Sequence, residues 1–333
     1  MDGLFLVSTI MSFFNLVLNV GVLVLLLLLR GKPKMFLYQL RAMLASVVLY
    51  SFIRTCDRVI PRRLYRPSPI WGAFLCHIWA SRYLSLVAYT LAVLCLNFMV
   101  GNRAIQIACR YQYSFSTSVA ANLAYPCGFC LLSIISMIPQ TLIVQWDGKK
   151  CNCLDTDVSY GALVSLYTET FVRFGLTAVI SVIILSISCY DIIHWVRNTP
   201  PEQLSDTWNI VYLPGSTKKQ LQTFSRPQGW LTTSLCTVPL SVNFLVFSIY
   251  DTGYKFICAA GLCTIRLDSP LHRADRLLTD IQLFLLPIII TVYIPALREL
   301  PVRFWQKLVA LGVKLRTGSC VTSERGQQNS DLP

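Results

Sequence analysis

The stretch LFLVSTIMSFFNLVLNVGVLVLLLLL, residues 4–29, decides the class of this protein, because it contains no charged side chain over its whole length. About 20 consecutive apolar residues are enough for a helix to cross the hydrocarbon core of a bilayer. The run is too long for the apolar part of a cleavable signal peptide, and neither a small-residue cleavage site nor a preceding basic residue accompanies it. We therefore interpret residues 4–29 as a first transmembrane helix.

Six further stretches have a similar length and apolar character. Only 14% of the 333 residues are charged, against about 25% in soluble domains. The sequence therefore predicts an all-α membrane protein, a bundle of seven transmembrane helices. The predicted spans are Leu4–Leu29, Phe36–Cys56, Leu75–Gly101, Val119–Ile143, Ala162–Trp195, Trp230–Tyr250 and Arg276–Leu297.

The basic residues of the loops predict the orientation in the membrane. No Lys or Arg precedes the first span, and the loop after it holds Arg30, Lys32 and Lys34. We expect a multi-pass protein of the plasma membrane with its N-terminus outside and its C-terminus in the cytoplasm. Arg41 and Arg54 lie near the ends of the second span, where we expect them to snorkel toward the interfaces.

The segment after the last span has a different pattern. Aromatic and aliphatic residues alternate with Arg303 and Lys307 at helical spacing, which predicts an amphipathic helix lying in the cytoplasmic interface. Cys320 follows, either as a palmitoylation site or as a plain free cysteine. We divide the chain into a transmembrane domain, residues 1–317, and a polar, disordered cytoplasmic tail, residues 318–333.

Several classes of protein fit the sequence poorly. The net charge of +13 is not accompanied by a basic helix or zinc spacing, so we assign it to loops facing anionic lipid rather than to nucleic-acid binding. The three histidines are scattered, and we predict no enzyme, no catalytic residue, no metal site and no cofactor. A transporter or channel, for which we would expect internal repeats, and a non-signalling membrane scaffold remain alternatives.

Ionisable residues inside the spans mark a candidate ligand site, because charge within a bilayer is costly and usually functional. With the orientation above, they and several aromatic or polar neighbours lie in the outer half of the bundle. The set is Arg82, Tyr83, Tyr89, Tyr167, Glu169, Arg173, Asp280 and Gln282. We expect Glu169 to pair with Arg173, four residues on, and Asp280 to pair with Arg82 across the bundle. The group describes either a ligand pocket or an ion-pair network that only locks the helices together.

The outer segments hold six cysteines, an even number that favours disulfides in an oxidising compartment. These are Cys56, Cys76, Cys151, Cys153, Cys258 and Cys263. Cys258 and Cys263 could close a small loop. Cys56 could bond to whichever cysteine of the second outer loop is left over.

The layout resembles the rhodopsin-like (class A, family 1) G-protein-coupled receptors, and short motifs at matching depths carry the resemblance. The first span contains Asn19-Val20-Gly21-Val22, similar to the Asn-x-x-Val of that family. Asn102-Arg103 at the inner end of the third span is similar to the Asp-Arg-Tyr segment. Tyr190 in the fifth span resembles a family tyrosine, and Cys236-Thr237-Val238-Pro239 is similar to Cys-Trp-x-Pro.

The sequence departs from the family pattern at other places. Val48 stands where the family has an aspartate in the second span, and the seventh span carries no Asn-Pro-x-x-Tyr. The distance from Cys76 to Arg103 is two residues too long, and Lys219 takes the place of an acidic partner for Arg103.

The resemblance implies a receptor that converts an extracellular ligand into activation of a heterotrimeric G protein by outward movement of its sixth helix. It assigns switch roles to Asn102, Arg103, Tyr190 and Pro239, with the proline giving the helix a hinge. Asn102 in place of an aspartate, together with Lys219, implies raised basal activity.

The resemblance also bears on the disulfides and on the ligand. It implies that Cys76 pairs with Cys151 or Cys153. Neither Tyr83 nor Ser85 supplies the acidic group that would bind an amine, which disfavours a monoamine ligand. The basic outer loops, beginning with Arg58, favour a peptide or a small acidic molecule.

Overall fold

A computed structural model describes residues 3–31, 34–59, 69–109, 118–148, 151–153, 160–200, 211–212, 235–261, 270–298, 300 and 309. Lys219, Arg303, Lys307, Cys320 and the predicted tail 318–333 lie outside these residues. So does nearly all of the predicted interfacial helix.

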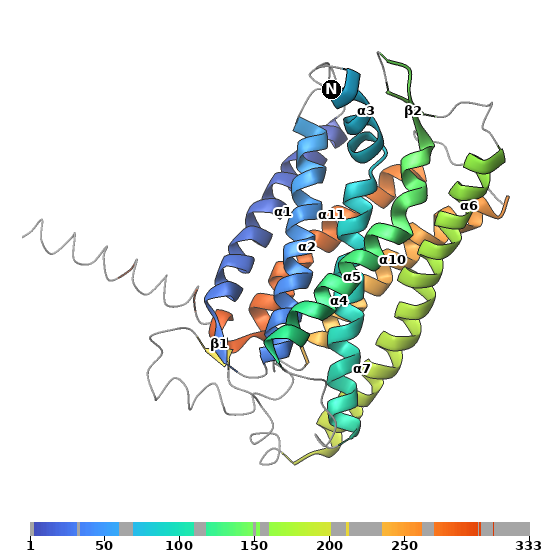
Figure 1. Cartoon of the computed structure of the whole chain (residues 1–333). Helices are drawn as coiled ribbons and strands as arrows, with labels where there is room; N and C mark the ends of the chain where they lie inside the picture. The colour runs from blue at the N-terminus through green and yellow to red at the C-terminus, as the bar shows by residue number, and fades with distance from the viewer. Residues whose placement is uncertain are drawn as a thin grey trace, which may run out of the picture.

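The described chain is predominantly helical (Figure 1). Its helical elements are α1 (Gly3–Leu28), α2 (Lys34–Val59), α3 (Pro69–Leu75), η2 (Cys76–Ala80), α4 (Tyr83–Ala108), α5 (Val119–Met137), η3 (Ile138–Ile143), α6 (Tyr160–Phe174), η4 (Gly175–Val179), α7 (Ile180–Asn198), α10 (Thr237–Ala259) and α11 (Pro270–Tyr293). Four short strands form two antiparallel pairs, β1 (Arg30–Gly31) with β4 (Val211–Tyr212) and β2 (Val144–Trp146) with β3 (Cys151–Cys153).

Five helical segments of the described chain are long and apolar enough to cross a membrane, at Leu6–Leu28, Met35–Val59, Ile70–Ala108, Ala120–Leu142 and Tyr167–Asn198. A shorter apolar helix covers Leu277–Tyr293. The predicted sixth span falls on α10, but its first residues lie outside the described chain. The all-α, membrane-embedded class therefore holds, while a full set of seven spans stays a prediction.

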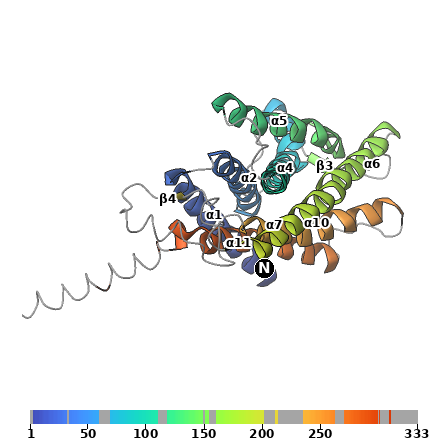
Figure 2. The same ribbon diagram turned by 90° about the horizontal axis from the view of Figure 1, so that it is seen from below.

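The long helices pack side by side as a bundle, with α4 lying between α2, α5 and α7 (Figures 1 and 2). Side chains from α1, α2, α4, α7, α10 and α11 form one continuous apolar core, in which Leu96 and Leu185 are completely buried. On α5, by contrast, Leu131 and Ile135 are more than half exposed. Such an apolar outer surface suits contact with lipid, where the helical backbone satisfies its own hydrogen bonds.

The two ends of the bundle differ. The end that carries the N-terminus, α3 and β2 is called the disulfide end below, after the Cys76–Cys151 bond found there (Figure 1). The other end carries β1 and is called the opposite end.

Arg41 fixes the junction between the first two helices at the opposite end. Its guanidinium donates to the carbonyl oxygen of Leu26 (3.0 Å), in the last turn of α1, and to that of Leu29 (2.7 Å), the residue that follows α1. A cation at the C-terminal end of a helix adds hydrogen bonds to its last carbonyls and complements the helix dipole. Arg41 thus contacts backbone at the end of the neighbouring helix, and whether it also reaches the membrane interface stays a prediction.

The third apolar segment is not one continuous α-helix. The π-turn η2 follows α3, and Arg82 then adopts a left-handed backbone (φ 64°) before α4 begins. Among the described residues other than glycine, Arg82 alone has a positive φ. This conformation is unfavourable for a side chain larger than hydrogen, so surrounding contacts must hold it.

Candidate functional site

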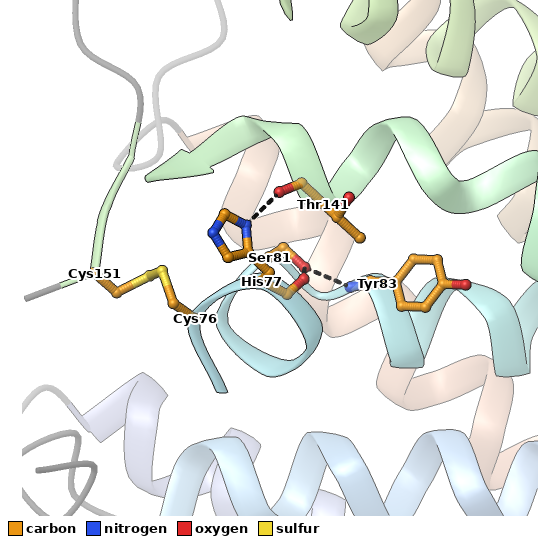
Figure 3. The surroundings of a disulfide bond; sticks show 6 residues. All are labelled: Cys76, His77, Ser81, Tyr83, Thr141 and Cys151. Carbon is orange, nitrogen blue, oxygen red and sulfur yellow. Dashed lines mark hydrogen bonds between the residues drawn. A yellow bond between two sulfur atoms is a disulfide. The ribbon is translucent and has the colours of Figure 1, made fainter. Parts of the chain in front are cut away.

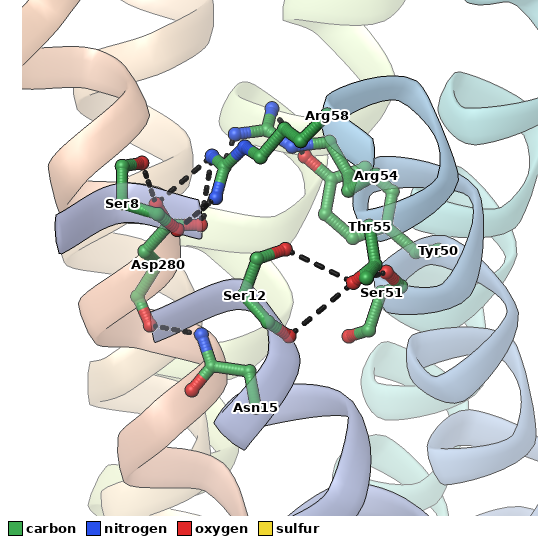
Figure 4. A network of polar contacts seen from close by, with 9 residues as sticks. All are labelled: Ser8, Ser12, Asn15, Tyr50, Ser51, Arg54, Thr55, Arg58 and Asp280. Atoms are coloured by element: carbon green, nitrogen blue, oxygen red, sulfur yellow. Dashed lines mark hydrogen bonds and ion pairs between the residues drawn. The ribbon is translucent and has the colours of Figure 1, made fainter. Parts of the chain in front are cut away.

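Asp280 lies at the centre of a buried cluster at the disulfide end, which we call the Asp280 clasp (Figure 4). Its carboxylate is 1% exposed. Arg58 Nη2 lies 3.0 Å from Oδ2 and 3.3 Å from Oδ1, and Arg54 Nη2 lies 3.9 Å from Oδ1. The hydroxyl of Ser8 donates to Oδ2 at 2.8 Å. The clasp therefore joins α11 to α2 and α1 through charge-assisted contacts in an apolar surrounding.

The predicted pairing of Asp280 with Arg82 is wrong. Arg82 is exposed at the start of α4, while Asp280 is sealed between α1, α2 and α11. The partner is Arg58, because α2 continues to Val59 and carries this residue inward as part of the helix. Arg54 likewise turns into the bundle, where its Nη1 donates to Tyr50 Oη (3.3 Å), instead of snorkelling to the interface.

Polar residues on one face of α1 hold this helix in a fixed position against α2 and α11, around the Asp280 clasp. Ser12 Oγ lies 3.1 Å from Thr55 Oγ1 on α2. Asn15 Nδ2 donates to the backbone oxygen of Asp280 (2.9 Å), and Asn19 Nδ2 donates to that of Leu283 (3.1 Å). These contacts fix the rotation of α1 against α11, because a polar group buried in lipid surroundings must find a partner.

Tyr89 connects four helices below the clasp. Its hydroxyl lies 2.7 Å from Ser248 Oγ on α10 and receives a longer hydrogen bond from Gln282 Nε2 on α11 (3.5 Å). Its ring lies 5.6 Å from that of Tyr50 on α2 and 6.3 Å from that of Phe244 on α10, measured between centroids. Two of the predicted ligand residues, Tyr89 and Gln282, are thus brought together.

The predicted ion pair between Glu169 and Arg173 forms on α6, one helical turn apart. Arg173 Nε lies 3.5 Å from Glu169 Oε1, and both side chains are almost fully buried. Near the pair, Phe171 and Phe174 of α6 contact Phe256 of α10.

Two predicted ligand residues lie elsewhere. The hydroxyl of Tyr83 donates to the backbone oxygen of Ile134 on α5 (3.1 Å), toward the outside of the bundle. Tyr167 is 40% exposed on α6. The eight predicted residues therefore do not form one pocket. Five of them fall into three groups, and Arg82, Tyr83 and Tyr167 stand apart.

The disulfide end is covered by the β2–β3 hairpin, which Cys151 ties to η2 through a bond to Cys76 (Figure 3). Of the two partners that sequence left open for Cys76, the structure uses Cys151. His77 Nδ1 lies 2.9 Å from the backbone oxygen of Thr141, and Gln140 Nε2 donates to that of Ser81 (2.9 Å). The two hydrogen bonds join η2 and Ser81 to η3, and the disulfide adds the β2–β3 hairpin to the same cap.

Of the remaining outer cysteines, some lie in the part of the chain that the structure describes and some lie outside it. Cys258 is disulfide-bonded, whereas Cys263 and the side chain of Cys153 lie outside the described part of the chain. Cys56 is a free thiol, so the expectation that it bonds to a second-loop cysteine is wrong.

At the opposite end, Arg103 is buried near the end of α4, and its Nη1 donates to Gln106 Oε1 (3.2 Å), a neutral acceptor on the same helix. Asn102 Nδ2 lies 3.7 Å from the sulfur of Met35 on α2.

The other two predicted switch residues are not gathered around Arg103. Tyr190 is 68% exposed and stacks on His194, four residues on along α7. Pro239 lies in the first turn of α10 as described, with residues 213–234 outside the description, so a hinge there stays a prediction.

Sequence reasoning missed most of the residues that surround Asp280. It placed Arg58 in a loop and treated Arg54 as an interface residue. A usable signal was present, because Arg54 and Arg58 are four residues apart and lie on one face of a helix. Ser8 and Asn15 gave a weaker signal, since small polar residues also occur in spans without a special role.

A scan against protein-family models and a search of curated proteins both give no match to this chain. A functional assignment consequently rests on the sequence pattern and on the contacts described above.

Proposed function

We propose that this chain is a divergent rhodopsin-like G-protein-coupled receptor of the plasma membrane, with its N-terminus outside and its C-terminus in the cytoplasm. Its ligand binds at the disulfide end, and a heterotrimeric G protein binds at the opposite end. The observation that carries the proposal is that a single helix, α4, connects these two ends. Tyr89, in the polar network, and Arg103 lie on the same helix α4, about 21 Å apart along its axis.

The ligand favoured by this site is a peptide or a small acidic molecule. Arg54, Arg58 and Arg173 all lie toward the disulfide end, and guanidinium groups bind carboxylates and phosphates in a planar, two-pronged geometry. Arg54 and Arg58 retain 17% and 12% exposure of their side chains, against 1% for Asp280. An anion that arrives at this end therefore meets the guanidinium groups before the carboxylate.

The mechanism follows from the contact between α4 and α10. Ser248 on α10 is bonded to Tyr89, so a ligand that displaces Tyr89 or the neighbouring Gln282 changes how α10 packs on α4. A ligand that binds one packing more tightly shifts the equilibrium toward it. We propose that the favoured packing moves the opposite end of α10 outward and opens the region around Arg103 to the G protein.

The experiment measures basal dissociation of G proteins of the major subtypes in cells that express the full chain. Arg103→Ala is compared with Arg197→Ala, a matched control at an exposed arginine in the last turn of α7. We expect basal dissociation in the native chain, its loss in Arg103→Ala, and little change in the control.

Surface expression of each variant is measured alongside. Equal loss in both variants would mean that the effect is not particular to Arg103, which contradicts a specific switch role. A native chain that reaches the surface and gives no signal with any subtype would contradict raised basal activity and would favour the non-signalling scaffold.

A further inference from the structure

Gln39 is a buried amide of α2 that lies toward the opposite end of the bundle. It is 1% exposed and follows Met35 by one helical turn. Neither its amide nitrogen nor its amide oxygen has a hydrogen-bond partner within the described chain. Among the buried asparagine and glutamine side chains of the described residues, it alone lacks a partner for both groups. Buried polar groups of native proteins are almost always hydrogen-bonded, so this amide needs an explanation.

Asn102 on α4 is a second incompletely paired amide at this end. It is 7% exposed, and its Oδ1 accepts no hydrogen bond within the described chain. Its Nδ2 lies 3.7 Å from the sulfur of Met35, and a thioether is a weak acceptor. The two amides therefore both lie near Met35, one across the contact between α2 and α4 and the other one turn along α2.

Gln39 lies on the face of α2 that is turned toward α4. Met35, near the start of α2, contacts Asn102 near the end of α4. Tyr50, further along α2, contacts Tyr89 near the start of α4. The two helices are therefore antiparallel, and helical periodicity places Gln39 between Met35 and Tyr50 on the shared face.

The directions of the two side chains bring the amides to the same level. Side chains in a helix lean toward the N-terminus of their own helix. Because α2 and α4 are antiparallel, Gln39 leans toward the level of Asn102, and Asn102 leans toward the level of Gln39. Each amide has both a donor and an acceptor, so two facing amides can form two reciprocal hydrogen bonds.

The unpaired amides make the described conformation less stable than one in which they are paired, because a buried polar group without a partner costs free energy. Arg103, the residue after Asn102, is 4% exposed in this conformation. The opposite end is therefore closed to a G protein that would contact Arg103. The cost of the unpaired amides falls on the closed state.

We propose that Gln39 is a positioning residue for Asn102 and Arg103, and that its amide pairs with that of Asn102 when the opposite end opens. The amides destabilise the closed state, in which they are unpaired, and stabilise the open state, in which they are paired. Such a difference shifts the equilibrium toward opening without a ligand. This inference rests on the proposed function and names a contact that regulates its G-protein end.

Thermal unfolding tests the unpaired amide without a G protein. The full chain is purified in detergent, and Gln39→Leu is compared with Gln140→Leu. We expect Gln39→Leu to raise the Tm, because it removes a buried amide that has no partner. Gln140→Leu should lower the Tm, because Gln140 Nε2 donates to the backbone oxygen of Ser81 at 2.9 Å. A fall in the Tm of Gln39→Leu would identify a satisfied structural amide and overturn the inference.

Basal dissociation of G proteins in cells tests the pairing. Gln39→Leu and Asn102→Leu should each lower it roughly fivefold, and the double variant should lose no more than either single variant. The exchange of Gln39→Asn with Asn102→Gln keeps two amides at the contact and should keep the native level. Gln145→Leu is the control, at an exposed position on β2 of the disulfide end, and should change nothing.

Additive losses, or an exchange variant as weak as Gln39→Leu, would contradict the pairing. A raised Tm together with unchanged basal dissociation would contradict the role of the pair in opening. A native chain without basal dissociation contradicts the raised basal activity of the proposed function, and the Tm of Gln39→Leu still decides whether its amide is unpaired. The two proposals can therefore fail separately.

Discussion

At the residue scale, buried charge sets the arrangement of the disulfide end. Asp280 on α11 attracts Arg54 and Arg58 from α2, and together with Ser8 they join three helices at one point. Another arginine, Arg82, which immediately precedes α4, remains at the surface. Arg54 and Arg58 turn into the bundle toward a buried carboxylate on a facing helix, because an arginine enters an apolar bundle only where its charge is paired.

Replacing Asp280 by alanine should lower the free energy of unfolding by about 3–5 kcal/mol, because it leaves two largely buried guanidinium groups without their carboxylate. Asp251→Ala is the control, since its pair with Lys255 is more exposed and should contribute about 0–1 kcal/mol. Chemical unfolding of both variants in detergent micelles measures the difference. Equal losses in the two variants would show that the clasp contributes no more than a surface pair.

At the scale of elements, the third apolar segment shows how an irregular helix accommodates extra chain. Between Cys76 and Arg103 the sequence has two residues more than the receptor family that it resembles, and the structure has the π-turn η2 and the left-handed Arg82 within that interval. A π-turn contains more residues than an α-turn. We attribute the excess to η2 and Arg82, which leaves α4 continuous from Tyr83 past Arg103.

The cap at the disulfide end depends on one close approach between elements. A Cβ placed on Gly72 of α3 would lie 2.5 Å from Trp146 Cη2 on β2, whereas one placed on Gly128 of α5 would meet nothing within 4 Å. Gly72→Ala should therefore destabilise the chain by about 1–3 kcal/mol through overpacking. Gly128→Ala should be neutral or stabilise by about 0.5–1 kcal/mol through its helix propensity.

Thermal unfolding of the two glycine variants tests this packing, and the combination of Gly72→Ala with Trp146→Ala should restore part of the lost stability. If Gly72→Ala and Gly128→Ala behave alike, the hairpin does not pack on α3 as described.

At the scale of the whole molecule, orientation and the number of spans can be tested together. Acceptor sites for N-glycosylation are inserted, one at a time, within residues 154–159, 202–208 and 262–268 of the full chain. With seven spans and an outside N-terminus, the first and third insertions should be glycosylated and the second should not, because only outer loops reach the lumen during synthesis. Glycosylation at 202–208, or its absence at 262–268, would contradict the predicted topology.

The sequence by itself determined the class of this protein. Runs such as residues 4–29 leave no alternative to a helix in lipid, because an isolated span must satisfy its backbone hydrogen bonds internally. Sequence also determined contacts within one helix, such as Glu169 with Arg173, because a separation of four residues fixes the geometry.

Contacts between helices were decided by the tertiary structure alone. Whether Asp280 meets Arg82 or Arg58 depends on how far α2 continues, on the rotation of α1 set by Asn15 and Asn19, and on the turn at Arg82. The choice of Cys151 for Cys76 depends likewise on the path of the hairpin. No local pattern encodes these choices, because helix rotation and register are set by packing against every neighbour at once.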